Sequence, residues 1–89
     1  MSFRSSATPE FWKAYYQLPD PVRTLARKNY RLWQADPFYA SLHFKKVGRE
    51  NWSVRIGDHY RAVGKFVDAA FLWEWIGTHE AYNQLIKRL

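Results

Sequence analysis

The hydrophobic period of this 89-residue chain changes at Pro37, and the change restricts the fold more than any other feature. Before Pro37 the apolar residues recur at helical spacing, whereas after it they alternate with polar residues as in half-buried strands. Helices followed by strands predict an α+β domain, with helices packed on one face of an antiparallel sheet. We expect one domain over residues 1–89, because this length supports one hydrophobic core and no linker divides it.

A short strand over Ser2–Ala7 and two helices are predicted before the change of period. The first helix has Thr8 as its N-cap and ends near Gln17, because a proline two residues later disfavours further helix. The second begins with Asp20 as its cap and ends at Asp36. Each has one apolar side, so the two are expected to form a hairpin with a shared hydrophobic face.

The second part of the chain predicts a twisted sheet of about four strands and a closing helix. Gly57-Asp58 and Asp68-Ala69 have the residue types of tight turns, and Gly77-Thr78 is expected to break the last strand. The strands are expected at His43–Val47, Trp52–Ile56, Tyr60–Val67 and Ala70–Ile76, and the helix at Glu80–Leu89.

Side-chain size indicates how the strands pair. If Val67 pairs with Ala70, then Gly64 lies opposite Trp73 and Ala62 opposite Trp75, so that each tryptophan meets a small residue. The expected core face then consists of Trp52, Val54, Ile56, Tyr60, Ala62, Phe66, Phe71, Trp73 and Trp75, and the outer face of Ser53, Arg55, Arg61, Val63, Lys65, Leu72 and Glu74.

In this register Arg55 lies directly opposite Arg61 on the outer face. Like charges in that position destabilise a sheet, so the pair indicates an anion-binding site. The interpretation requires both guanidinium groups on one side of the sheet and outside internal ion pairs. A net charge of +6, from 14 Lys and Arg against 8 Asp and Glu, also favours a nucleic acid or an acidic protein as partner.

Composition excludes several classes of protein. Because the chain has no cysteine, it has neither a disulfide framework nor a thiolate metal site. The first ten residues lack the apolar run of a signal peptide, and no stretch approaches the roughly 20 apolar residues of a membrane span. We therefore expect a cytoplasmic protein with no membrane partner, and we expect no small-molecule cofactor.

Three motifs resemble the RelE/ParE superfamily of bacterial toxins: Trp52-Ser53-Val54-Arg55-Ile56, Tyr60-Arg61-Ala62-Val63 and the segment from Trp75 to Tyr82. The resemblance covers nearly the whole chain. It implies a RelE/ParE-like fold with the active face opposite the helix hairpin. It also implies a toxin of a type II toxin–antitoxin module that acts as a ribosome-dependent mRNA endonuclease without a metal. The implied partners are an antitoxin protein, the ribosome and mRNA.

The resemblance also implies roles for individual residues. Arg61 would bind the scissile phosphate with Arg55, and His79 would act as the general acid or base. The implied contacts to RNA or its phosphates are Lys45, Lys46, Lys65 and Tyr82, where Tyr82 would stack on a base or orient His79. Glu80 follows His79 here, and Glu50 and Glu74 are the only nearby carboxylates that could serve as a base.

Two alternatives remain open from the sequence. The chain could instead be a ParE-like inhibitor of DNA gyrase, which needs no acid–base residue, or an inactive toxin relative that acts as a binding module. Other features have simpler interpretations: His43 and His59 are expected at the surface or in turns, and Trp73 and Trp75 in the core. The basic run Arg23, Arg27, Lys28 and Arg31 is expected to form a solvated helix face, with ribosomal RNA contact as the alternative.

Overall fold

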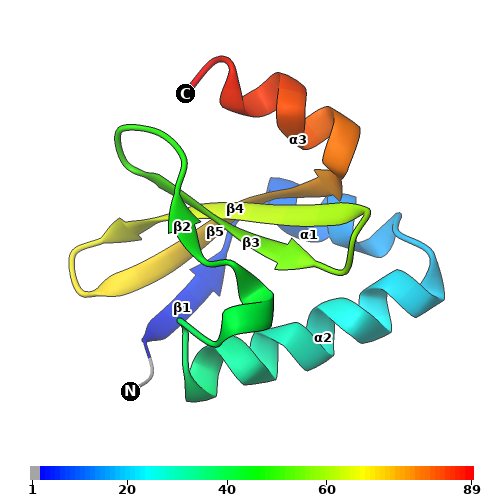
Figure 1. Ribbon diagram of the computed structural model, residues 1–89, viewed down its shortest axis with the longest axis horizontal. Coiled ribbons are helices and arrows are strands. Elements are labelled where there is room, and N and C mark those ends of the chain that lie inside the picture. The colour runs from blue at the N-terminus through cyan, green and yellow to red at the C-terminus, as the bar shows by residue number, and fades with distance from the viewer. Residues whose placement is uncertain (1–2) are drawn as a thin grey trace.

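The computed structural model describes residues 3–89 as three helices and a five-stranded sheet, in the α+β arrangement predicted from the sequence (Figure 1). The chain order is β1 (Arg4–Ala7), α1 (Pro9–Tyr16), α2 (Asp20–Ala35), a 3₁₀ turn (Ala40–Leu42), β2 (Lys45–Lys46), β3 (Asn51–Ile56), β4 (Tyr60–Val67), β5 (Ala70–Thr78) and α3 (His79–Ile86). Of the predicted strand Ser2–Ala7, the residue Ser2 lies outside the described part.

The sheet has the order β1-β5-β4-β3-β2. Four strands are antiparallel, as predicted, and β1 adds a fifth strand that runs parallel to β5. Such a parallel neighbour needs a long crossover, and here α1, α2 and the following strands provide it. In the view of Figure 1, α2 lies below the sheet and α3 above it.

The helix hairpin forms as the capping residues predict, with one difference of detail. Thr8 caps α1 by accepting a hydrogen bond from the amide of Phe11 at 3.0 Å. Asp20, predicted as the N-cap of α2, is instead its first residue and forms an ion pair with Arg23. Arg23 also donates to the carbonyl oxygens of Tyr16 and Leu18, and so fixes the turn between the helices.

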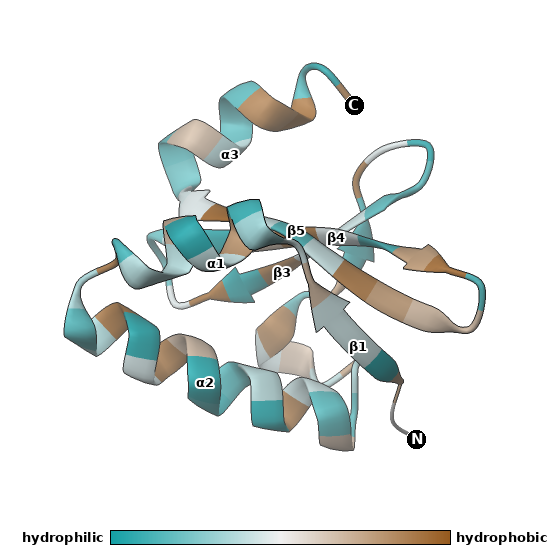
Figure 2. Cartoon of the chain, turned by 180° about the vertical axis from the view of Figure 1, so that it is seen from behind, coloured by the Kyte–Doolittle hydropathy of each residue, from teal (hydrophilic) through white to brown (hydrophobic). Residues whose placement is uncertain are grey.

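The core lies between this hairpin and one face of the sheet. Trp33 of α2 is at its centre, 1% exposed, and its ring meets those of Phe71 and Trp73 at centroid distances of 5.3 and 5.1 Å. Figure 2 shows that hydrophilic and hydrophobic residues alternate in bands along α2, as expected for a helix with one buried side. Burying several aromatic rings gives a domain of this size a large apolar contribution to stability.

The register agrees with the prediction near the β4–β5 turn and departs from it farther along. Gly64 pairs with Trp73, as predicted, but Trp75 pairs with Val63 rather than with Ala62. Glu74 is an extra residue on β5, a β-bulge, which turns Trp75 to the outer face and brings Ile76 into the core opposite Ala62. The prediction of Trp75 as a core residue was therefore wrong.

Three boundaries also differ from the prediction. Strand β5 continues through Gly77 to Thr78, because both residues pair with β4 instead of breaking the strand. Thr78 then caps α3 by accepting from the amide of Ala81 at 3.1 Å, so the helix begins at His79 and ends at Ile86. The strand predicted at 43–47 is only two residues long, since His43 has a left-handed backbone with φ 47°.

Candidate basic groove

Strands β3 and β4 place two arginines side by side on the outer face of the sheet. Arg55 pairs with Arg61 in the antiparallel register, so both side chains leave the sheet on the same side. The turn between the strands supplies an acceptor to both, because the carbonyl oxygen of Gly57 accepts from Nε of Arg55 and from Nη1 of Arg61, each at 3.1 Å. The first requirement of the sequence interpretation is thus met.

The second requirement is met by Arg61 and not by Arg55. Arg55 forms an ion pair with the exposed carboxylate of Asp58 in the turn. Within residues 3–89 Arg61 has no carboxylate partner, and all its hydrogen bonds, to the carbonyl oxygens of Gly57, Asp58 and Tyr60, run through Nη1. Its Nε and Nη2 edge therefore remains available for the two-point contact that phosphates favour.

The electrostatics of Arg61 are those of a cation held without a counter-ion. Burial and the charge of Arg55 lower the pKa of Arg61 from its usual value, while Tyr82 and Asp58 act in the opposite direction. The guanidinium stays charged at neutral pH, as arginine does in proteins. A bound anion would therefore offset both unfavourable contributions.

Tyr82 of α3 lines the same groove as Arg61, with its ring next to the guanidinium. Its side chain is only 5% exposed, and its hydroxyl lies 3.0 Å from the hydroxyl of buried Ser53. Its ring lies 6.0 Å from the Arg61 guanidinium carbon and is stacked with the ring of His79 at a centroid distance of 6.2 Å. Since the ring is covered, it offers little free surface on which a base could stack, and it lies next to Arg61 and His79.

His79 reaches the same groove from the start of α3. Its amide donates to the carbonyl oxygen of His59 at 2.8 Å, which ties the beginning of the helix to the β3–β4 turn. The groove, of about 210 Å³, brings together five of the seven predicted site residues: Lys45, Arg55, Arg61, His79 and Tyr82.

Two predicted residues lie elsewhere. Lys46 pairs with Trp52, so its side chain leaves the sheet on the core side, away from Arg61. Lys65 is on the outer face but does not line the groove, and its ammonium group lies 3.8 Å from the carboxylate of Glu74. Neither Glu74 nor Glu50 lines the groove, and no carboxylate is among its described lining residues.

The groove also contains residues that sequence reasoning missed. His43, expected only at the surface or in a turn, is exposed and lines the groove, together with Ser53, Asn83 and Ile86. The available signal was its position two residues before Lys45, which a continuous strand would place on the same face. Among residues 3–89, no cluster of His, Asp and Glu could hold a metal ion, and no helix combines the length and hydrophobicity of a membrane span.

Comparisons with known proteins agree with this architecture. A family model described as a ParE-like toxin domain matches residues 20–84. No curated protein matches the sequence significantly. Among solved structures, the isolated RelE toxin of E. coli is 18% identical with a TM-score of 0.69, and the alignment covers 98% of each chain.

Two further structures show the same fold. RelE in the RelB–RelE antitoxin–toxin complex of Methanococcus jannaschii is 13% identical with a TM-score of 0.70, over 89% of this chain and 95% of that one. The YoeB/ParE toxin of Agrobacterium tumefaciens is 18% identical with a TM-score of 0.66, over 85% of this chain and 98% of that one.

Proposed function

The chain belongs to the family of ParE-like toxin domains, and from that premise we propose that it is the toxin of a toxin–antitoxin module that cleaves mRNA on the ribosome. One observation carries the proposal: Arg61 presents a free guanidinium edge in a groove that also contains two imidazoles and a lysine. RNA cleavage without a metal needs cations for the phosphate and groups that exchange protons near neutral pH.

The chemistry assigned to the groove is attack of an RNA 2′-hydroxyl on the adjacent phosphorus. The new P–O bond forms as the 2′-oxygen loses its proton, and the bond to the 5′-oxygen breaks as that oxygen gains one. Arg61 holds the phosphate and stabilises its growing negative charge, an effect worth about 100- to 1000-fold for a single donor. Arg55 and Lys45 add positive charge on either side of Ser53.

Proton transfer is assigned to the two imidazoles in the groove, His43 and His79. An imidazole can accept or donate a proton near neutral pH, so the pair can supply both steps without a carboxylate. Tyr82 positions His79 through the stacking of their rings. This assignment accounts for the absence of Asp and Glu from the described lining of the groove.

The partners follow from the same proposal. Substrate mRNA and the ribosome would meet the basic outer face, and an antitoxin protein would neutralise the toxin. The Methanococcus jannaschii RelE structure is that of a complex with the antitoxin RelB, which supports such a partner here. We place the protein in the cytoplasm, where its substrate is translated.

The test is cell-free translation with primer-extension mapping of mRNA ends. The purified chain should cut mRNA in the ribosomal A site, and Arg61→Ala should reduce cutting at least 100-fold while the domain stays folded. Arg4→Ala is the matched control, because it removes the same charge from an exposed position on β1 outside the groove. Intact mRNA with the unmodified chain would refute the proposal.

Inhibition of DNA gyrase is the second candidate, and the ParE-like family model together with the carboxylate-free groove favours it. A gyrase poison acts by binding and needs no proton transfer. Toxicity that persists in His43→Gln and His79→Gln, together with blocked supercoiling, would establish this candidate. Loss of toxicity in either variant with supercoiling unaffected would support RNA cleavage instead.

A further inference from the structure

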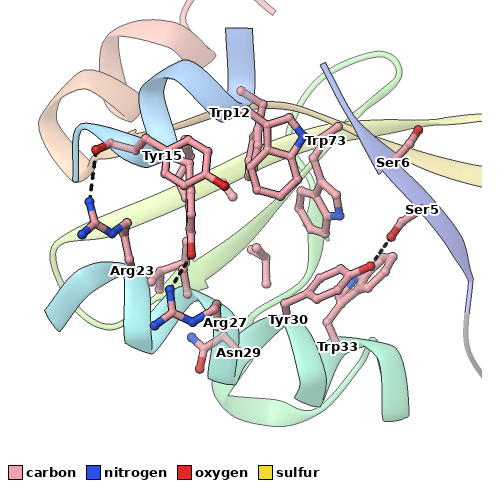
Figure 3. A pocket seen from close by; sticks show the side chains of 18 residues that line it. Ser5, Ser6, Trp12, Tyr15, Arg23, Arg27, Asn29, Tyr30, Trp33 and Trp73 are labelled. Carbon is pink, nitrogen blue, oxygen red and sulfur yellow. Dashed lines mark hydrogen bonds between the residues drawn. The ribbon is translucent and has the colours of Figure 1, made fainter. Parts of the chain in front are cut away.

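A second and larger cavity lies on the opposite side of the sheet from the basic groove. It has a volume of about 500 Å³, within the range of roughly 300–1,000 Å³ typical of small-molecule sites. Trp33 and Trp73 form part of its walls (Figure 3). Trp12, Tyr16 and Tyr30 also line it, and they keep 45%, 67% and 37% of their surface exposed. The cavity is therefore aromatic and open to solvent.

The cavity exists because the two helices of the hairpin pack on different strands. Helix α1 packs against β5 and α2 against β3, which leaves a wedge between them. One hydrogen bond spans this wedge, since Arg27 of α2 donates to the hydroxyl of Tyr15 in α1 at 2.8 Å (Figure 3). A second joins α2 to the sheet, between the hydroxyls of Tyr30 and of Ser5 in β1 (Figure 3).

Two buried donors in the cavity walls have no acceptor. Trp33 and Trp73 are 1% and 6% exposed, and neither indole Nε1–H has a hydrogen-bond partner within residues 3–89. Buried tryptophan N–H groups in proteins usually find an acceptor. Because less than 1 Å² of each Nε1 atom is accessible, a molecule in the cavity would meet the carbon atoms of these two rings and not their N–H groups.

The charge at the rim points to an anion. Arg27 contacts only the neutral oxygens of Tyr15 and Thr24, whereas Arg23 beside it is paired with Asp20. No carboxylate is among the described residues that line the cavity. A ligand that suits these walls thus has a flat ring for the aromatic side chains and a negative charge for Arg27.

We propose that this cavity binds a small planar aromatic carboxylate. The ring lies among the aromatic walls, and the carboxylate meets the guanidinium of Arg27. The site is separate from the proposed RNA chemistry, because the sheet lies between it and Arg61.

The experiment uses 2-naphthoate as the probe, measured by calorimetry on the full chain and by the indole N–H signals in ¹H–¹⁵N spectra. We expect saturable binding, with the Trp33 and Trp73 signals displaced. Arg27→Gln should weaken binding about tenfold, the loss of one charge-assisted contact. Arg31→Gln, which removes an exposed charge from the same helix outside the cavity, should change it less than about twofold.

One analogue tests the carboxylate without altering the protein. We expect 2-naphthol, which lacks the carboxylate, to bind about tenfold more weakly than the probe. Arg61→Ala should leave binding of the probe unchanged, so a failure of the RNA proposal is distinguishable from a failure here.

Several results would overturn the proposal. These are no saturable binding at millimolar probe, equal affinity of the probe and 2-naphthol, or equal losses in the Arg27 and Arg31 variants. Displacement of signals from His79 instead of the two indoles would place the probe in the basic groove. An amphipathic peptide that binds this cavity and is not displaced by the probe would assign the cavity to a protein partner.

Discussion

The repulsion between Arg55 and Arg61 can be measured as a coupling in the free energy of unfolding. Both side chains donate to the carbonyl oxygen of Gly57 at 3.1 Å, so the two donor nitrogens lie no more than about 6 Å apart. At that separation, with an effective dielectric constant of about 40–80 for half-exposed groups, the repulsion is roughly 1 kcal/mol. This agrees with the scale of cross-strand pair energies, about 0.2–1 kcal/mol.

The assay is a double-mutant cycle of Arg55→Gln, Arg61→Gln and the double variant, each unfolded with urea in low salt. The ion pair of Arg55 with Asp58 is lost in both legs of the cycle that remove Arg55, so its energy cancels. We expect an unfavourable coupling of about 1 kcal/mol, equivalent to about 1 M in urea midpoint when the slope is near 1 kcal/mol per molar.

Salt provides the control for this cycle. The Debye length falls from about 10 Å at 0.1 M to about 3 Å at 1 M salt, so most of the coupling should vanish at 1 M. A coupling that is zero or favourable at low salt would refute the reasoning that Arg55 and Arg61 are held together against their charge. A coupling that salt does not change would refute its electrostatic origin.

Three other variants test the packing and the charge of the groove. Gly64→Ala should destabilise the domain by about 1–3 kcal/mol in urea unfolding, because the added Cβ would lie 2.4 Å from both Leu72 O and Phe71 Cε2. A stability equal to that of the unmodified chain would contradict the register. Tyr82→Phe should lower the free energy of unfolding by about 1–3 kcal/mol, because it leaves the buried hydroxyl of Ser53 unpaired. Adding Ser53→Ala should recover part of that loss. An unchanged melting temperature in Tyr82→Phe would argue against the hydrogen bond. A plot of the logarithm of the binding constant for a 2′-O-methyl oligonucleotide against the logarithm of the salt concentration should have a slope near −2, as expected for about three phosphate contacts. Arg61→Gln should reduce the magnitude of this slope by about 0.7. An unaltered slope would show that Arg61 does not contact the oligonucleotide.

Local patterns in the sequence predicted most of the fold. The change of period at Pro37 separated helices from strands, and Thr8 marked the start of α1 because its side chain satisfies a helix amide whatever the tertiary context. Pairing large with small residues placed Gly64 opposite Trp73 correctly, because that contact lies close to the β4–β5 turn. Pairing across a short turn leaves few alternatives for the register.

The error in β5 comes from a residue that breaks alternation without a signature in the sequence. Glu74 has no mark that distinguishes a bulge from a regular strand residue, so every pairing expected beyond it along β5 was shifted by one. His43 was missed although alternation from Lys45 placed it on the outer face, and its left-handed backbone at the end of the 3₁₀ turn was not predictable from that pattern. Alternation predicts a groove only as far as the strand remains regular.

The paired arginines of the site were predictable from the strands, whereas His79 and Tyr82 of α3 were expected only from the family resemblance. All four line the groove, but the strand residues Lys46 and Lys65 do not. Arg55 and Arg61 followed from counting residues across one tight turn. The covered position of Tyr82 depends on how α3 returns over the sheet, and the sequence alone carried no information about that angle. The partnership of Arg55 with Asp58 was also hidden, because it depends on the conformation of the turn.

Because side chains alternate along a strand, the extra residue Glu74 reverses the sheet face on which each later side chain of β5 lies. Deleting Glu74 would leave a regular strand with the pairings that β5 has now, because Trp75 already lies opposite Val63 and Ile76 opposite Ala62. Pairing Glu74 itself with Val63 would instead turn Trp75 to the interior and Ile76 outward, and α3 would leave the sheet with the opposite orientation. A one-codon deletion of Glu74 is thus expected to preserve the groove, whereas a deletion of one paired residue between Trp75 and His79 would dismantle it.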